Sequence, residues 1–535
     1  MKSRRHFLTR MPLGALGAIA AWKLKAQTTD SGEVPGAGSI FNLDAGAGPE
    51  ISEVTFAEAE KLMRVEMTPA HREMAAASWR TSMAGMTARR TGPNAVSLEE
   101  GLAPATVWNP QVSAHVVGPQ QDRFQPAAIE ATPLPDKDAD IAFASVARLG
   151  HWIRTGKLSS ERLTQIYIAR IKRFDPKLRC VITLLEEHAL KQARRADREI
   201  AAGKYRGPLH GIPWGAKDLL DTAGIRTTFG AEPFRNRVPK EDAAVVKRLN
   251  DAGAVLLAKL SMGALALNDI WFGGQTMNPW VPEEGAGGSS AGPGSATAAG
   301  LVAFAIGSET QGSIIDPAMR CGVTGLRPTF GRVPRNGAMT LCWTLDKLGP
   351  LTRSVDDTML VLKAISGPDT GDVASVPSHL DYVADASVKG LKVGYFPGWM
   401  NEAPATDVDS ATLKTLAKLG LELKPVSLPD WPWSTLNVIL FAEAAAAFEE
   451  LTLSGKDDAM TVQTPDAWPN AFRQSRFLSA VDFVQADRLR RKVAGMMASL
   501  MSEVDLLMVP SLRDEMLIIS NNTGQPSLTL RTGFV

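Results

Sequence analysis

The sequence predicts an α/β protein, in which strands of a sheet alternate with helices along the chain. Short apolar runs of the kind that form buried strands occur at 254–258, 302–306, 391–395 and 506–509. Stretches with the helical spacing of apolar residues separate them. The chain has 535 residues, of which 44% are hydrophobic and 21% charged, and this composition fits a folded globular protein with one large domain and additions.

The first 26 residues predict a signal peptide of the twin-arginine type. Residues 1–10 are basic and contain Ser-Arg-Arg-His-Phe-Leu at positions 3–8. The apolar run 11–22 that follows has 12 residues, whereas a membrane span needs about 20. We therefore expect a bacterial protein that is exported to the periplasm or the medium, without stable membrane insertion once the signal is removed.

Charge and cysteine usage exclude several classes of protein. The chain has 58 basic and 57 acidic side chains, and removal of residues 1–26 with their six basic residues changes the formal net charge from +1 to −5. A nucleic-acid partner is excluded because it needs a basic surface. Three cysteines without CxxC spacing exclude a disulfide scaffold and a thiolate zinc site. The histidines form no HExxH motif, so we expect no metal and no cofactor.

The chain divides at about residue 137. Residues 27–137 predict a linker to about residue 40, a helical stretch at 50–86 and a Pro- and Gly-rich arm at 91–135.

Residues 138–535 predict the main domain. Its first helices are expected at 141–153, 159–171 and 185–202. Residues 400–500 are largely helical and are expected to cap the functional site.

The densest motif is the Gly- and Ser-rich segment 285–300. Its residues alone allow a flexible loop, a phosphate-binding loop, or a nucleophile elbow at Gly288-Ser-Ser290-Ala-Gly292. No Gly-Lys-Ser/Thr ends the segment, as a phosphate-binding loop requires. An elbow needs a buried strand before it and a histidine after it, and His379 is the only histidine after residue 290.

A second serine, Ser313, lies 24 residues after Ser289, on the turn that leaves the apolar run 302–306. An oxyanion hole needs backbone N–H groups that converge on one point. The groups that this turn can offer belong to Thr310, Gln311, Gly312 and Ser313.

Three motifs resemble the catalytic positions of the amidase signature family. They are Lys217 in Pro208-Leu-His-Gly-Ile-Pro-Trp-Gly-Ala-Lys-Asp218, Ser289 in Gly-Gly-Ser-Ser-x-Gly, and Ser313 in Gly-Ser-Glu-Thr-Gln-Gly-Ser. The resemblance covers about residues 140–535 and is most specific at 207–353. It implies a large mixed, mostly parallel twisted sheet covered by helices on both faces.

The resemblance also implies a Ser–Ser–Lys triad. By position, Ser313 resembles the nucleophile, Ser289 the bridging serine with a cis peptide bond, and Lys217 the general base. Ser290 and Gly288 then have supporting roles. A lysine acts as a base only when it is neutral, which requires burial that lowers its pKa.

Three features depart from the family pattern. Gln311 stands where the family has a glycine, and it would be strained there at a positive φ. Ile315 stands where the family commonly has an arginine, so we expect an apolar or neutral acyl group in the substrate. Family members usually continue with another strand and helix beyond the position of Val535, so we expect a sheet that lacks its last elements.

The leading hypothesis is an exported amidase that hydrolyses a carboxamide of a small molecule or peptide and releases ammonia or an amine. One alternative is the glutaminase-type A subunit of a glutamyl-tRNA(Gln) amidotransferase, against which the export signal argues. Another is a non-catalytic binding protein on a degenerate amidase scaffold, which Gln311, Ile315 and the early end of the chain suggest.

Overall fold

The computed structural model describes residues 46–63, 65–99, 102–105, 118–119, 121–129 and 132–534. The predicted signal peptide and linker lie outside these residues, as do parts of the predicted arm. In the described part of the chain, no helix combines the length and the apolar character that a membrane crossing needs.

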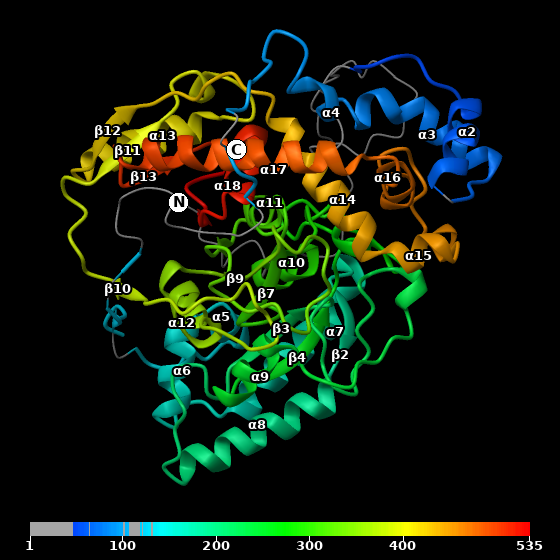
Figure 1. Ribbon diagram of the computed structural model, residues 1–535. Helices are drawn as coiled ribbons and strands as arrows, with labels where there is room; N and C mark the ends of the chain where they lie inside the picture. The colour runs from blue at the N-terminus through cyan, green and yellow to red at the C-terminus, as the bar shows by residue number, and fades with distance from the viewer. Residues whose placement is uncertain are drawn as a thin grey trace, which may run out of the picture.

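A mixed sheet of seven strands lies at the centre of the described residues, in the order β14-β8-β9-β7-β3-β4-β2 (Figure 1). Strand β3 (Pro213–Lys217) pairs in parallel with β7 (Phe304–Glu309) and with β4 (Val255–Leu260). The outer pairings are antiparallel, through β2 (Val181–Leu184) on one side and β9 (Lys347–Thr352), β8 (Thr324–Arg327) and β14 (Ser527–Thr529) on the other. The parallel part of the predicted sheet therefore consists of the inner strands β7, β3 and β4.

Helices cover this sheet and confirm the predicted fold class (Figure 1). Helix α10 (Ala291–Ala298) packs across β7 and β3, and α8 (Glu186–Ala201) packs on β4. Helix α7 (Ser160–Leu178) starts where the sequence predicts, because the Ser159 hydroxyl caps it by accepting the Arg162 N–H at 3.0 Å. The expected helix at 141–153 is divided into α5 (Asp138–Ala142) and α6 (Val146–Arg154).

The N-terminal helices lie against the predicted cap (Figure 1). The expected helical stretch 50–86 comprises α2 (Glu53–Met63), α3 (Pro69–Ser82) and the start of α4 (Gly85–Ala88). Helix α3 contacts α16 (Trp468–Ser475), and α4 contacts α14 (Asn437–Ala447). The Gln474 side chain donates to the Ala75 carbonyl at 2.9 Å, so the contact between the two segments is hydrogen-bonded as well as apolar.

A second, parallel sheet consists of β12 (Glu422–Pro425), β11 (Lys392–Tyr395) and β13 (Leu506–Met508). The other described strands are β1 (Arg123–Gln125), β5 (Ile270–Trp271), β6 (Gly274–Gln275) and β10 (Asp381–Val383). The other described α-helices are α9 (Ala244–Asp251), α11 (Ile315–Arg320), α12 (Val355–Ile365), α13 (Asp407–Lys418), α15 (Glu449–Leu453), α17 (Ala480–Met501) and α18 (Asp514–Asn522). Short 3₁₀ helices lie at Glu232–Phe234, Ala264–Ala266, Trp399–Asn401, Trp433–Leu436 and Lys456–Ala459.

Candidate active site

Lys217, the last residue of β3, is fully buried and its amine contacts three serines. Its Nζ lies 2.8 Å from the Oγ of Ser289, 3.0 Å from the Oγ of Ser290 and 2.8 Å from the Oγ of Ser308. Ser308 belongs to the neighbouring strand β7, so parallel pairing of β3 with β7 places the lysine beside it. The structure thus brings together Lys217, Ser289 and Ser290.

The environment of Lys217 favours the neutral amine. Burial lowers the pKa of Lys217 well below its ordinary value, and the carboxylates of Asp346 and Glu309 offset only part of this effect. Asp218 does not neutralise the lysine, because consecutive strand residues point to opposite faces. Its carboxylate instead pairs with Lys259 at 3.3 Å and accepts the Thr228 N–H at 2.7 Å.

The segment before α10 holds Ser289 in place. The peptide bond between Gly288 and Ser289 is cis. Gly288 donates its N–H to Asp316 at 2.7 Å, and burial raises the pKa of Asp316 to about 6. Ser290 is completely buried, where its hydroxyl donates to the Ser308 carbonyl at 3.0 Å and accepts the Ser308 N–H at 3.1 Å. These bonds give Gly288 and Ser290 a supporting role in the geometry.

Ser313 follows β7 on a turn that leads into α11. Its carbonyl accepts the Ser290 N–H at 3.1 Å, so the turn is joined to the segment that carries Ser289. Among the described residues, no hydrogen bond joins the Ser289 and Ser313 hydroxyls. Catalytic hydrogen bonds are often long without substrate and tighten when it binds.

The predicted oxyanion turn has unused backbone donors. No described residue accepts a hydrogen bond from the N–H groups of its four members, Thr310, Gln311, Gly312 and Ser313. The positive φ of this turn, 96°, belongs to Gly312. Gln311 has no positive φ, so the strain expected from its replacement of a glycine does not arise.

A buried ion cluster that the sequence did not reveal supports this turn from the opposite face of β7. One Glu309 oxygen accepts the N–H groups of Ile314 and Ile315 at 2.9 and 3.0 Å. The other accepts from Arg327 at 2.7 Å and from Asn521 at 3.0 Å. Burial alone raises the Glu309 pKa, but the Arg327 cation and the N–H donors lower it to about 2.

Lys347 also belongs to this cluster, since antiparallel pairing of β7 with β9 sets it opposite Glu309. Its Nζ has no hydrogen-bond partner among the described residues. Burial and the cation of Arg327 lower the pKa of Lys347 to about 7. The sequence held a signal for this cluster, because Glu309 and Lys347 are charged residues at the ends of the buried strands β7 and β9. No local pattern identified Arg327 and Asn521 as the partners of Glu309.

On the side of β7 that carries Ser308, a cavity of about 220 Å³ adjoins the site. Ser308, Thr310 and Asp346 line it at the strand ends, and the loop at 335–343 forms much of the rest. The carboxylate of Asp346 accepts from the Thr310 hydroxyl at 2.7 Å. The cavity therefore reaches both a hydrogen-bonding partner of Lys217 and the first residue of the oxyanion turn.

The competing interpretations of the serine-rich segment find no support. His379 is half exposed and its Nδ1 lies 3.2 Å from an Asp122 carboxylate oxygen, so it contacts neither serine of the proposed elbow. Ser290 caps α10 but follows no strand. Among the described residues, no group of three or more His, Cys, Asp or Glu side chains is placed to hold a metal ion.

The fold and the site together carry the groups that a serine hydrolase with a lysine base would need. Comparison with known families places the chain more narrowly. The model of the family described as Amidase matches residues 162–529. The chain belongs to the amidase family and is an enzyme that acts on the carbon–nitrogen bond of amides.

Known proteins of this family show two kinds of similarity. The first is to the A subunit of glutamyl-tRNA(Gln) amidotransferases. The one from Nitrosococcus oceani is 32% identical over 440 residues, which are 73% of this chain and 91% of the relative. The one from Moorella thermoacetica is 40% identical over 321 residues, 58% of this chain and 65% of the relative.

The second is to solved amidase structures. The peptide amidase of Stenotrophomonas maltophilia is similar with a TM-score of 0.65 and 30% identity, covering 73% of this chain and 91% of that one. An amidase family protein of Bacillus anthracis is similar with a TM-score of 0.66 and 27% identity, covering 74% and 86%.

Proposed function

We propose that the protein cleaves a carboxamide through an acyl-enzyme on Ser313. The observation that carries the proposal is the distance of 2.8 Å between Nζ of the buried Lys217 and Oγ of Ser289 after its cis peptide bond. A neutral amine has a lone pair that can accept the Ser289 proton, and Ser289 can in turn accept the proton of Ser313.

The reaction then proceeds in two stages. Ser313 Oγ attacks the amide carbon while its proton passes through Ser289 to Lys217, and the N–H groups of the oxyanion turn stabilise the negative oxygen. In other enzymes one such donor lowers the activation barrier by about 2.7–4 kcal/mol. Collapse breaks the carbon–nitrogen bond, and the Lys217 proton returns through Ser289 to the departing nitrogen. Water then attacks the acyl-enzyme by the same route and frees the acid.

The second candidate differs in the fate of the ammonia. The relatives at 32% and 40% identity belong to glutamyl-tRNA(Gln) amidotransferases, and this favours the amidotransferase alternative over a free-standing hydrolase. In that case the substrate would be glutamine, and a partner protein would receive the ammonia. The peptide amidase structure supports hydrolysis of a terminal carboxamide by the same core.

Ammonia release from the purified full-length protein tests both candidates. Glutamine and uncharged primary carboxamides are compared in the wild type and in Lys217→Ala. Turnover that the variant loses supports the acyl-enzyme proposal. Glutamine turnover that rises with added amidotransferase partner proteins and glutamyl-tRNA favours the second candidate. A folded protein that neither turns over an amide nor reacts with a serine reagent supports the degenerate binding protein.

Export belongs to the proposal as well, and it rests on the sequence of residues 1–26. Fractionation of cells that express the full chain tests it. We expect the wild type in the periplasm or medium, and the double variant Arg4→Lys/Arg5→Lys in the cytoplasm. Wild-type protein found in the cytoplasm with an amidotransferase partner would contradict export.

A further inference from the structure

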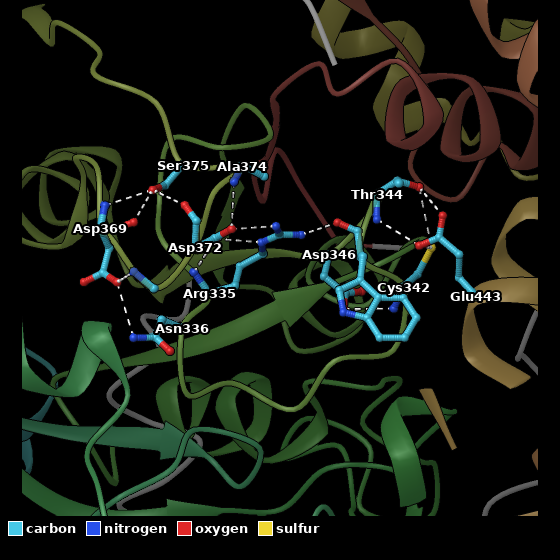
Figure 2. A network of polar contacts seen from close by, with 12 residues as sticks. Arg335, Asn336, Cys342, Thr344, Asp346, Asp369, Asp372, Ala374, Ser375 and Glu443 are labelled. Atoms are coloured by element: carbon cyan, nitrogen blue, oxygen red, sulfur yellow. Dashed lines mark hydrogen bonds and ion pairs between the residues drawn. The ribbon is translucent and has the colours of Figure 1, made fainter. Parts of the chain in front are cut away.

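The cavity beside the candidate active site contains charged side chains, and hydrogen bonds within the protein already engage them. Arg335 donates from Nε and from Nη2 to the two carboxylate oxygens of Asp372, each at 2.9 Å. Figure 2 shows the guanidinium directed at Asp372, and its remaining nitrogen donates to the Trp343 carbonyl. Burial opposes ionisation of Asp372, but the hydrogen bonds from Arg335 hold its pKa below the ordinary value. A ligand anion therefore finds no free cation at Arg335.

The other acidic side chain of the cavity, Asp346, accepts hydrogen bonds from neutral groups instead of pairing with a cation. One oxygen of Asp346 accepts the Thr310 hydroxyl, and the other accepts the N–H groups of Leu341 and Cys342 at 2.8 and 3.0 Å. Asp346 therefore anchors the loop 335–343 through two of these hydrogen bonds. A ligand ammonium would have to displace these bonds.

The wall also has an apolar part, although polar groups line more of the cavity. It includes Leu219, Ala266, Met339, Leu341 and Leu348. The Trp343 side chain is 49% exposed and lines the cavity where it meets solvent. At about 30 Å³ per water molecule, the volume of about 220 Å³ holds a group of roughly seven non-hydrogen atoms.

The wall is also fixed in position. Figure 2 shows Glu443 of the cap helix α14 reaching the cavity loop. Its carboxylate accepts the Thr344 hydroxyl at 2.7 Å, the Thr344 N–H at 3.0 Å and the Cys342 thiol at 3.2 Å. Hydrogen bonds hold the loop 335–343 at Arg335, its first residue, and at Thr344, which follows its last residue. Arg335 therefore cannot turn toward a ligand without breaking several hydrogen bonds.

From this arrangement we propose that the cavity binds the acyl part of the substrate and selects an uncharged acyl group over an acidic or zwitterionic one. The inference rests on the proposed amide cleavage. A primary carboxamide releases only ammonia, which needs no cavity of this size, so the acyl part is its occupant. An anion in the cavity would lose its hydration without gaining a free cation as a partner, which is unfavourable. Glutamine, which carries two charges, is accordingly a poor substrate.

A pair of substrates of equal shape tests the selection. 4-Methylpentanamide and succinamate differ in that an isopropyl group replaces a carboxylate. For the full-length protein we expect kcat/KM for 4-methylpentanamide to exceed that for succinamate by at least roughly 100-fold. Equal or reversed rates, or efficient turnover of glutamine, would overturn the inference while leaving the amide-cleaving proposal intact.

A matched pair of variants tests the location. Thr340 lines the cavity, and Thr340→Arg adds an unpaired cation there, whereas Thr340→Gln adds bulk without charge. We expect the arginine variant to shift the kcat/KM ratio toward succinamate by roughly 10-fold or more, and the glutamine variant to leave the ratio near that of the wild type. An unchanged ratio in the arginine variant would place the acyl group elsewhere.

A binding measurement distinguishes failure of the cavity assignment from failure of the proposed amide cleavage. Calorimetric titration of Lys217→Ala with both amides needs no turnover. Tighter binding of 4-methylpentanamide supports the cavity assignment even if the wild type is inactive, and tighter binding of succinamate contradicts it. An inactive wild type whose Ser313 resists a fluorophosphonate would instead contradict the proposed chemistry.

Discussion

Nζ of Lys217 lies 2.8 Å from Oγ of Ser289, and both side chains are shielded from solvent. Position along the sequence does not create this contact, because 72 residues separate the two. Lys217 lies at the carboxyl end of strand β3, and Ser289 follows the cis peptide bond after Gly288. In α/β sheets, ligands bind outside the carboxyl ends of the parallel strands, which is where this pair lies.

Substitution of Lys217 removes the proposed base without leaving a buried charge unpaired. We expect Lys217→Ala to lower kcat by roughly 10²–10⁴-fold, the range that a general base contributes. Steady-state ammonia release measures the effect, and circular dichroism confirms that the variant is folded. A folded variant with wild-type kcat would remove Lys217 from the mechanism.

The pH dependence of activity reveals the protonation state of Lys217. Because burial lowers the pKa of Lys217 well below its ordinary value, the base is neutral at pH values where an exposed lysine is protonated. We expect kcat/KM to fall on the acid side as Lys217 gains a proton, at a pH far below the roughly 10.4 of an exposed lysine. An acid limb that starts near that ordinary value would contradict a buried, neutral base. The profile is measured with an uncharged amide so that the substrate does not titrate.

Glu309 both pairs with the buried Arg327 and accepts hydrogen bonds from the residues that follow the oxyanion turn. Glu309→Gln removes the ion-pair partner of Arg327 and leaves this buried cation without it. We expect a loss of about 3–5 kcal/mol in the free energy of unfolding, measured by urea denaturation. The control is Glu503→Gln, which breaks an exposed pair with Lys424 at 2.7 Å and should cost less than about 1 kcal/mol. Equal effects in the two variants would contradict the account.

The low pKa of Glu309 also predicts an acid dependence. Its folded pKa of about 2 lies below the ordinary value of 4.5. The stability that it contributes is therefore fully present above pH 4.5 and is lost as the pH falls toward 2. We expect the acid limb of the unfolding free energy in this window to flatten in Glu309→Gln. If the unfolding free energy of Glu309→Gln fell with acid as steeply as that of the wild type, carboxyl groups other than Glu309 would be responsible for the fall.

Lys347 gives a prediction for the neutral and alkaline range. Its folded pKa is about 7, below the ordinary value of 10.5. Between these values the unfolded chain binds more protons than the folded one, so the contribution to stability rises with pH. We expect Lys347→Met to remove this slope and to raise the free energy of unfolding at about pH 6 by about 1–4 kcal/mol. Urea midpoints between about pH 6 and about pH 9 measure it, and a variant that is destabilised at the acid end of this range would contradict the account.

The sequence predicted those parts of the fold and site that depend on neighbouring residues. The cap at Ser159 and the apolar runs of β4 and β7 are local signals, and the structure places these elements where the signals lie. The motifs around Lys217 and Ser289 also located the residues that meet in space.

The rest depends on contacts between distant segments. Glu309 meets Asn521 across 212 positions of the chain, and no local pattern predicts such a pair. The positive φ at Gly312 instead of Gln311 depends on how the turn is held by the Glu309 carboxylate, which accepts two N–H groups beyond it. Ser308, a third serine beside Lys217, became apparent only through the pairing of β3 with β7.

Fluorophosphonate labelling of the purified protein tests whether Lys217 activates Ser313, because the reagent reports an activated serine without knowledge of the substrate. Mass spectrometry of the labelled peptide identifies the site. The account predicts an adduct on Ser313 in the wild type and its loss in Lys217→Ala. An adduct on Ser290, or a Ser313 adduct that persists when Lys217 is removed, would contradict it.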